Sequence, residues 1–394
     1  MPEVKSSVLS TSTGRPVRVA HLTTVDLSLA VLLGTELEVD VSSGLQTFAL
    51  SAPGPYVPRI EQQGVTHVPV PSLTRSWDLR KDAAAARELY TALRNLKPDV
   101  LHTHNPKSGV LGRMVGHLAG VPVVVNTCHG LWASPDSQWV KRLAVYAIEA
   151  FASSFSDAEL YQNADDHGVL RRLVRGYKTE VVGNGIDLLR YGPDPDARRR
   201  VRGELGIGED DILVGGVGRL VAEKGLREFA GAARALRGEA VFAWVGPEDD
   251  HRTEAVYVDG RDVRFVGARA DMPAVYNAFD IFVLPSYREG FSRSAMEAAA
   301  TGLPLVLSDI RGCREIGANE QETLLVPARN TEALAAAIKR LLGNEELRAT
   351  LGAAVRRRAL EAFDQRRVAA RSLETYAEVA RRRGLGWRRA EAPS

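Results

Sequence analysis

The chain has 394 residues, more than one hydrophobic core usually organises, and this length predicts two or three domains. Hydrophobic residues make up 45% and charged residues 25%, which is typical of a globular protein and not of a disordered one. A formal net charge of +2 argues against a dedicated nucleic-acid binder, which would carry a basic excess. Basic residues are nonetheless clumped, for example at 198–200 and 356–358. Such runs indicate solvated helix faces, or a patch that meets an anionic membrane.

The two cysteines, Cys128 and Cys313, have no metal-ligand spacing and are too few for a disulfide framework. Residues 1–16 are polar and lack the apolar segment of a signal peptide. No run approaches the ~20 apolar residues of a membrane span. We therefore expect a cytoplasmic protein, at most peripheral at the inner face of the membrane.

Short apolar runs alternate with longer helical stretches in the first half of the chain. Strands are predicted at 17–22, 46–51, 65–70, 98–102 and 121–127, and helices from about Leu27, over 77–96 and over 109–119. This alternation predicts βαβ units and a parallel sheet that is covered on both faces.

The same pattern restarts in the second half. Strands are predicted at 212–217, 240–245, 263–266, 281–284 and 305–307, with helices at 225–236 and 294–300. Between the halves, residues 183–211 are rich in Gly, Pro, Asp and Arg and are predicted to be a linker. The fold class is therefore α/β, with two Rossmann-like doubly wound domains that face each other across a cleft. Ligands of such sheets bind beyond the carboxyl ends of the strands.

The segment 286–297, SYREGFSRSAME, follows a predicted strand and runs into the predicted helix at 294–300. Gly290 allows a tight turn before this helix. The unpaired amides and the dipole at the helix start form an anion site near Phe291 and Ser292. The segment is therefore suited to bind a phosphate group.

Two carboxylates, Glu289 and Glu297, flank the start of this helix. A carboxylate binds phosphate poorly but accepts hydrogen bonds from sugar hydroxyls. The pair is therefore suited to hold a ribose and a second sugar. The alternative is that Glu289 caps the helix and Glu297 lies on the surface.

The segment 214–225, VGGVGRLVAEKG, places glycines at the end of a predicted strand. Gly218 lets a ligand approach the backbone closely, and Arg219 and Lys224 supply two positive charges. A departing diphosphate needs such charge, because its oxygens become more negative in the transition state. The Gly-Lys-Ser/Thr ending of a Walker A loop is absent.

Together these segments resemble the family 4 (group 1) glycosyltransferases, which are retaining enzymes with the GT-B fold. That family carries a Gly-Gly-x-Gly-Arg…Glu-Lys-Gly loop, found here at 215–225, and a Glu-x7-Glu motif, found here at 289–297. The resemblance covers about residues 17–376. It includes VGNGID at 182–187 and Gly267, where the backbone of the family holds the nucleobase.

The resemblance implies a role for each matching position. Arg219 and Lys224 are similar to the diphosphate clamp, and Glu297 to the carboxylate that grips the ribose hydroxyls. Glu289, with the amides of 290–292, is similar to the group that orients the donor sugar.

The resemblance also implies a division into domains. Residues 16–183 correspond to an acceptor-side domain, 190–365 to the domain that binds the nucleotide sugar, and 366–385 to a C-terminal helix that crosses back to the first domain. The basic-aromatic tail at 387–389 is expected to be disordered.

His129, in the segment NTCHG, resembles the histidine that reaches the donor from the facing domain. By itself such a residue is more often a satisfied core histidine. His102 and His104 lie in the segment LHTHNPKSG at another strand end, and only one of them is expected to point into the cleft. We expect His104 and Lys107 to line the acceptor side.

We predict no metal and no cofactor, so that transfer is metal-independent. Two histidines two residues apart suggest zinc, but no third ligand follows at a sensible spacing. No Asp-x-Asp pair follows a strand to hold a divalent ion against the diphosphate.

The sequence departs from the family at the loop after the first strand. Many members have two glycines there that approach the donor phosphate and the acceptor, whereas this chain reads HLTTVDLS at 21–28. Thr23 and Thr24 offer hydroxyls to the acceptor side instead, without the close approach that glycine allows.

We therefore predict a hexosyltransferase that moves a sugar from a nucleotide-diphosphate sugar, best a UDP-sugar, to a hydroxyl. The acceptor is a glycan, a lipid-linked glycan or a natural product, with no nucleic-acid partner and with peripheral membrane contact. A nucleotide-sugar epimerase of the GT-B fold and a catalytically silent glycosyltransferase-like partner are the alternatives. A sugar phosphorylase is disfavoured, because it would have a much longer chain with a pyridoxal-phosphate lysine.

Overall fold

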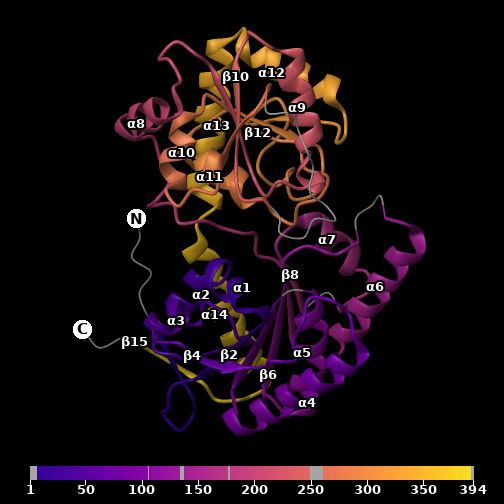
Figure 1. Cartoon of the computed structure of the whole chain (residues 1–394). Coiled ribbons are helices and arrows are strands. Elements are labelled where there is room, and N and C mark those ends of the chain that lie inside the picture. Colours follow the sequence, from indigo (N-terminus) through magenta and orange to yellow (C-terminus); the bar gives the residue numbers. More distant parts are fainter. Residues whose placement is uncertain (1–6, 105, 134–136, 176–177, 249–260, 392–394) are drawn as a thin grey trace. The chain divides into compact units, whose positions relative to one another are not determined.

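The computed structural model describes residues 7–104, 106–133, 137–175, 178–248 and 261–391. The chain forms two compact units (Figure 1). The first unit contains Met1–Gly183 and Gln365–Ser394, and the second contains Asn184–Asp364. Each unit has its own parallel sheet and its own hydrophobic cores. Two parallel-sheet α/β units confirm the predicted Rossmann-like architecture.

The first unit is built on a seven-stranded parallel sheet with the order β4-β3-β2-β5-β6-β7-β8. The chain order reverses between β2 and β5, and an open α/β sheet binds ligands beyond the carboxyl ends of such strands. The strands are β2 (Arg18–Val25), β3 (Gln46–Ala52), β4 (Thr66–Pro69), β5 (Val100–His104), β6 (Val123–Cys128), β7 (Ala158–Tyr161) and β8 (Thr179–Val181).

Helices cover both faces of this sheet (Figure 1). One face packs against α4 (Leu79–Leu96) and α5 (Pro106–Leu118), with α6 (Trp139–Ser153) beside α5. The other face is covered by α1 (Asp26–Val31), α2 (Gly34–Ser42), α3 (Val57–Glu61) and α14 (Gln365–Arg382). The short helix α7 (Ala164–Leu170) follows β7. Because both faces are covered, the strands are almost continuously apolar.

Helix α14 belongs to the first unit although the second unit precedes it in the sequence. It packs against α2 and buries Tyr376 and Val379 in the core beneath the sheet. Beyond it, β15 (Arg388–Glu391) pairs antiparallel with β1 (Ser7–Ser10), and Trp387 packs against the same core. The expectation of a disordered tail at 387–389 is therefore wrong. Pairing with a strand from the other end of the chain orders this tail, and no local pattern in the sequence indicates such a pairing.

The second unit is built on a six-stranded parallel sheet with the order β11-β10-β9-β12-β13-β14. Its chain order reverses between β9 and β12. The strands are β9 (Leu213–Val217), β10 (Val241–Val245), β11 (Arg264–Gly267), β12 (Ile281–Leu284), β13 (Leu305–Ser308) and β14 (Leu324–Val326).

Two hydrophobic cores flank the second sheet. One lies beneath α9 (Leu226–Ala235) and α12 (Thr331–Leu342). The other lies beneath α8 (Pro195–Leu205), α10 (Met272–Ala278), α11 (Arg293–Thr301) and α13 (Glu345–Ala362). The unit therefore has three layers, with helices on both faces.

Helix α8 lies within the segment that the sequence predicts to be a linker, so this part of the prediction is wrong. The Asp194 carboxylate accepts hydrogen bonds from the amides of Asp196 and Ala197 and so caps the start of the helix. Gly206 ends the helix in the left-handed conformation, with φ of 61°. Asp-Pro and Gly are loop residues, but they are also signals for the start and end of a helix.

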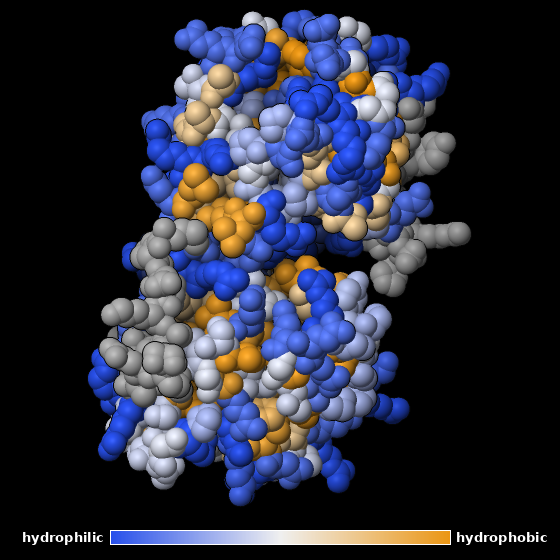
Figure 2. Space-filling model, turned by 90° about the vertical axis from the view of Figure 1, so that its left-hand side faces the viewer, coloured by the Kyte–Doolittle hydropathy of each residue, from blue (hydrophilic) through white to orange (hydrophobic). Residues whose placement is uncertain are grey.

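The surface in Figure 2 is largely hydrophilic, with separate apolar patches of modest size. Among the described residues, no helix is both long and apolar enough to cross a membrane.

Candidate active site

Lys224 and Glu289 follow β9 and β12, the neighbouring strands at which the order of the second sheet reverses. Lys224 ends the short 3-10 helix η2 (Ala222–Lys224), and Glu289 lies in the loop before α11. Lys224 Nζ lies 2.6 Å from Glu289 Oε1, and the Ser286 hydroxyl donates to the same oxygen at 2.7 Å. The structure therefore joins the lysine of one predicted motif to the carboxylate of the other at the edge where ligands bind.

The loop that carries Lys224 and the loop that carries Glu289 are in close backbone contact. Gly225 has φ of 71°, and a Cβ at this position would lie 1.9 Å from the carbonyl oxygen of Pro285. The amide of Tyr287 donates to the carbonyl of Glu223 at 2.8 Å. Only glycine combines this conformation with this contact, so the Glu-Lys-Gly sequence has a structural reason as well as a chemical one.

A third loop, after β13, supports the Glu289 turn from behind. Gly312 has φ of 81°, and a Cβ there would lie 2.7 Å from the carbonyl oxygens of both Glu289 and Gly290. The edge is therefore assembled from the loops that follow three adjacent strands.

The residue that caps α11 is Ser292, whose hydroxyl accepts a hydrogen bond from the amide of Ala295 at 3.3 Å. The alternative that Glu289 caps this helix is therefore wrong. Phe291 is buried and packs edge-on against Phe363. A ligand can therefore contact its backbone but not its side chain. The helix start places the positive end of its dipole just after the Glu289 turn.

Glu297 lies one turn into α11 and accepts a hydrogen bond from the Tyr276 hydroxyl at 2.8 Å. Burial raises the pKa of Glu297, against the lowering effect of Arg293 and of the tyrosine hydrogen bonds. The alternative that Glu297 is a plain surface residue is therefore wrong, since its carboxylate is held and partly desolvated.

The other predicted donor residues lie at the same edge of the second sheet. Gly218 follows β9; its carbonyl accepts a hydrogen bond from the Trp244 indole at 2.8 Å, and the Lys224 side chain passes over it. Arg219 is exposed one residue further on. Gly267 ends β11 with φ of 80°, and within the described part of the chain no atom beyond its two neighbours lies within 4 Å of the position that a Cβ would take, so this side of the backbone is open to a ligand.

In the first unit, four side chains form a continuous row of hydrogen bonds, which we call the histidine wire. Asp40 Oδ2 lies 2.7 Å from His21 Nε2, and His21 Nδ1 lies 3.1 Å from His104 Nε2. His104 Nδ1 lies 3.1 Å from His129 Nε2. Two predicted site residues, His104 and His129, are thus in direct contact, and a buried carboxylate lies at the far end of the row.

The expectation that only one of His102 and His104 faces the ligand side is corrected by the structure. Residues two apart on a strand share one face, and these two rings lie 4.1 Å apart, both fully buried. His102 has partners of its own. Its Nδ1 lies 2.6 Å from the Tyr376 hydroxyl, and its Nε2 lies 2.7 Å from the hydroxyl of Thr127.

The histidines of the wire and the neighbouring His102 differ in how readily they bind a second proton. Burial lowers the pKa of His129 to about 4 and lowers the pKa values of His102 and His104 well below the ordinary value. Burial also acts on His21, but the hydrogen bond and charge of Asp40 outweigh it and raise its pKa. His21 is therefore the member of the row that most readily carries a second proton.

The predicted acceptor-side threonines lie inside β2, which is longer than predicted. The Thr23 hydroxyl donates to the carbonyl of Val25 at 2.9 Å, and that of Thr24 lies 3.2 Å from the Ser108 hydroxyl. Both side chains are buried.

Lys107 is not brought together with His104. Its ammonium is buried, pairs with Asp82 and lies 3.3 Å from the Thr74 hydroxyl and 5.7 Å from the centre of the Trp77 ring. Lys107 therefore stabilises the start of α4 and the loop before it.

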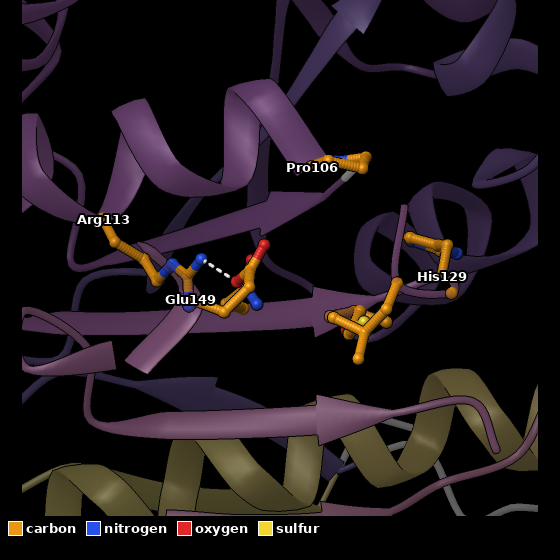
Figure 3. A pocket seen from close by; sticks show the side chains of 9 residues that line it. Pro106, Arg113, His129 and Glu149 are labelled. Carbon is orange, nitrogen blue, oxygen red and sulfur yellow. Dashed lines mark hydrogen bonds and ion pairs between the residues drawn. The ribbon is translucent and has the colours of Figure 1, made fainter. Parts of the chain in front are cut away.

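A small pocket adjoins His129 (Figure 3). On its far side the Arg113 guanidinium, from α5, lies 2.5 Å from a Glu149 oxygen of α6 and 2.9 Å from Glu159 of β7. Burial lowers the pKa of Arg113, but the two carboxylates outweigh it and keep the side chain charged. Arg113 thus fixes α5 and α6 around the loop that carries His129.

Four side chains of this cluster have the composition of a metal site: His21, Glu36, His102 and His104 each offer an atom within 4.8 Å of the others. Every ring nitrogen of the three histidines already has a hydrogen-bond partner within the protein. The absence of a metal stays a prediction.

His21 and Asp40 are site residues that the sequence did not single out. A signal was present for His21, because histidines stand near the ends of three predicted strands that a parallel sheet would bring together. The position of Asp40 on α2 gave no such signal, since only the packing of α2 under the sheet brings it to His21.

Known proteins share both the sequence and the fold. Residues 29–185 match the model of a glycosyl transferase 4-like domain, and residues 211–344 match the model of glycosyl transferases group 1. A UDP-Gal:α-D-GlcNAc-diphosphoundecaprenol α-1,3-galactosyltransferase of Escherichia coli is 31% identical over 71% of this chain and 75% of its own length. An N,N'-diacetylbacillosaminyl-diphospho-undecaprenol α-1,3-N-acetylgalactosaminyltransferase of Campylobacter jejuni is 29% identical over 74% and 80%.

Solved structures agree on the fold. Sucrose-phosphate synthase from Thermosynechococcus elongatus superimposes with a TM-score of 0.79 at 21% identity, over 93% of this chain and 100% of that one. Anabaena HepE, solved in complex with UDP and glucose, gives 0.78 at 18% identity, over 92% and 100%.

The two Rossmann-like units, together with the two family models that match them, identify a glycosyltransferase of the GT-B class. The chain belongs to the group 1, or family 4-like, glycosyltransferases.

Proposed function

We propose that the protein transfers a sugar from a nucleotide-diphosphate sugar, best a UDP-sugar, to a hydroxyl of a lipid-linked or growing glycan, with retention at the anomeric carbon. The observation that carries this proposal is the Lys224–Glu289 pair at the reversal point of the second sheet. A UDP donor is favoured by the galactosyltransferase of Escherichia coli and by the UDP complex of HepE.

The leaving diphosphate is bound by positive charge from the chain itself. Lys224, Arg219 and the start of α11 lie along one sheet edge, and each favours an anion there. In this proposal they supply the charge that a divalent ion supplies in other transferases, so transfer needs no metal. Glu297 accepts hydrogen bonds from the ribose, and the open backbone at Gly267 lies against the base.

Glu289 orients the donor sugar and does not attack it. Its Oε1 is shared between the Lys224 ammonium and the Ser286 hydroxyl, and a carboxylate oxygen held in this way is a weak nucleophile. The acceptor hydroxyl then attacks from the face that the diphosphate leaves, and the departing phosphate oxygen takes its proton. This route retains the configuration without a covalent intermediate.

A lipid-linked acceptor is supported by the surface of α6. Trp139, Leu143 and Phe151 are 72%, 61% and 57% exposed on this helix, which also carries Lys141 and Arg142. Exposed Trp, Leu and Phe beside basic residues are typical of helices that lie on an anionic membrane. The two relatives described above act on undecaprenol-linked sugars.

The test is a thermal-shift screen of the purified protein against UDP-, GDP-, ADP- and dTDP-sugars, with and without EDTA. A ligand that binds only the folded state raises the melting temperature with its concentration. We expect a shift with UDP-sugars that EDTA does not change. A shift that EDTA abolishes would contradict metal independence, and a shift with another base would contradict the UDP assignment.

Incubation with donor alone separates a transferase from an epimerase. A transferase leaves the donor sugar unchanged apart from slow hydrolysis, whereas an epimerase interconverts it without an acceptor. Lys224, Glu289 and Arg219 are all present, which favours an active enzyme over a silent partner.

A further inference from the structure

The histidine wire connects a buried carboxylate to a predicted ligand-binding histidine through two further rings. Its contacts are Asp40–His21 at 2.7 Å, His21–His104 at 3.1 Å and His104–His129 at 3.1 Å. Asp40, His21 and His104 are fully buried, while His129 is only partly covered at the end of β6. The row therefore leads from the core beneath the sheet to the edge where a ligand binds.

Each contact between two ring nitrogens holds one hydrogen, so the direction of every hydrogen bond depends on its neighbours. Asp40 accepts from His21 Nε2. If His21 also carries a hydrogen on Nδ1, it donates to His104, which then donates through Nδ1 to His129 Nε2. His129 is then left with its hydrogen on Nδ1. If His21 is neutral, it still donates through Nε2 to Asp40, but the two bonds between rings reverse, and Nδ1 of His129 carries a lone pair instead.

The charges around His21 favour its doubly protonated form. Asp40 and Glu36 are carboxylates of α2, and one oxygen of each has no hydrogen-bond donor among the described residues. Burial raises the pKa values of both carboxyls, whereas His21 lowers them, so an imidazolium here and the two carboxylates stabilise each other. The hydrogen bond and charge of Asp40 raise the pKa of His21. The other titratable groups that face this site are His102 and His104 of β5, His129 after β6 and Tyr376 of α14.

Gln162 does not fix the direction of the wire. It follows β7, and its side chain lies near the His129 ring and raises the pKa of that ring. Its amide offers both a donor and an acceptor and so can match either state by rotation. The state of His129 is therefore set from the buried end.

We propose that His21 acts through His104 as a positioning residue that sets which ring nitrogen of His129 carries hydrogen, and so whether His129 donates or accepts a hydrogen bond at the ligand. While His21 carries both protons, His129 presents an Nδ1–H donor, which suits an oxygen of a sugar or a phosphate. The significance for catalysis rests on the proposed function, whereas the coupling between the rings does not.

The first experiment is ¹⁵N NMR of protein labelled at the histidine ring nitrogens, recorded as a function of pH without any substrate. The chain has eight histidines, and single His→Gln variants assign them. Below the midpoint of the His21 titration we expect His21 to have both nitrogens protonated and His104 and His129 to be Nδ1–H tautomers. As pH rises, the signals of His104 and His129 should change with the same midpoint as His21 loses its proton.

The matched variants are His104→Gln and His102→Gln. Both residues are fully buried on the same face of β5, but only His104 is part of the wire. His104→Gln should uncouple His129 from the His21 titration, and His102→Gln should keep the coupling. A wild-type His129 that is an Nε2–H tautomer while His21 has both nitrogens protonated would overturn the proposal, as would coupling that survives in His104→Gln.

Metal analysis of the same sample tests the competing use of these rings. A metal ion held by His21, Glu36, His102 and His104 would take ring nitrogens that the wire uses. One equivalent of tightly bound zinc would therefore overturn the wire, and we expect none.

The second experiment compares the pH profiles of kcat/KM for sugar transfer. In wild type and His102→Gln we expect a fall of about tenfold at high pH, the size of one lost hydrogen bond, with the midpoint of the His21 titration. In His104→Gln this step should be absent. Coupled NMR titrations without any transfer activity would contradict the proposed function only, and activity without coupled titrations would contradict this inference only.

Discussion

Lys224 and Glu289 are an ion pair whose two members have different tasks. Their side chains are 22% and 11% exposed, so the pair is only partly shielded from water. An incoming diphosphate competes with Glu289 for the ammonium, and the Ser286 hydroxyl keeps the carboxylate in place meanwhile. The pair therefore holds the lysine ready for an anion and supplies an acceptor for sugar hydroxyls.

Replacing Lys224 with alanine should lower kcat for sugar transfer by roughly a hundredfold or more, because a charge aimed at the departing phosphate is lost. The protein should stay folded, because the Ser286 hydroxyl still donates to the Glu289 carboxylate when the lysine is gone. The measurement is steady-state kinetics together with thermal unfolding. Lys339→Ala is the control, because Lys339 of α12 pairs with Glu239 at 2.9 Å, away from the site, and should keep full activity. Unchanged turnover in Lys224→Ala would exclude the phosphate role.

His129 makes the stability of the first unit depend on pH. Burial lowers its pKa from 6.5 to about 4, so below pH 6.5 the unfolded chain binds a proton that the folded chain does not. The free energy of unfolding should therefore fall as the pH is lowered from 6.5 to 4, by on the order of 3 kcal/mol from this residue.

Urea unfolding at several pH values measures this effect. His129→Gln removes the titrating group, so its stability should fall less steeply than that of wild type over the same range. Parallel curves for the two proteins would contradict the assignment. His102 and His104 act in the same direction in both proteins. The raised pKa of His21 has the opposite effect, but above pH 6.5, because below it both the folded and the unfolded chain are protonated at this residue.

At the scale of elements, the sequence predicted the strands better than it predicted the helix at the domain junction. The strand at 281–284 was predicted with the bounds that the structure shows, and most others within three residues. Buried parallel strands are short apolar runs, and this signal is local. Helix α8 has a mostly polar sequence, so its composition resembled a linker although its cap residues were present.

The exposed apolar side chains of α6 predict membrane binding. A Trp139→Glu, Leu143→Glu double variant should lose most of its binding to vesicles that contain anionic lipid. The two apolar side chains that would enter the membrane are replaced by negative charges, which the anionic lipid repels. Vesicle sedimentation measures this directly. The control is Leu189→Glu, at a leucine of the second unit that is 75% exposed, and this variant should bind as wild type does. Equal binding of the double variant and wild type would remove α6 as the contact.

At the scale of the whole molecule, the two units differ in the number of chain segments that form them. The second unit is one uninterrupted segment, whereas the first needs the last part of the chain. Helix α14 buries Tyr376 in the core of the first unit and places its hydroxyl 2.6 Å from His102. Removing α14 would expose that core and leave the histidine without its partner.

We therefore predict that a fragment of residues 184–364 folds alone, whereas a fragment of residues 1–183 does not. The fragment 184–364 keeps its sheet and both flanking cores. The fragment 1–183 loses α14, one of the helices that cover one face of its sheet, and with it Tyr376 and Val379 of the core. Circular dichroism and urea unfolding of both fragments measure this. A fragment 1–183 with a cooperative transition would contradict the prediction, and adding back residues 365–394 by fusion to residue 183 should restore folding.

The sequence alone determined the alternation of strands and helices, the two-sheet architecture and the glycines that its loops require. These features depend on residues close together in the chain. It also identified Lys224 and Glu289 through their motifs. The histidine wire was decided only by tertiary structure, because its hydrogen bonds join residues 19, 83 and 25 positions apart. Those contacts depend on strand order and on the packing of α2 under the sheet, and no local pattern in the sequence specifies either.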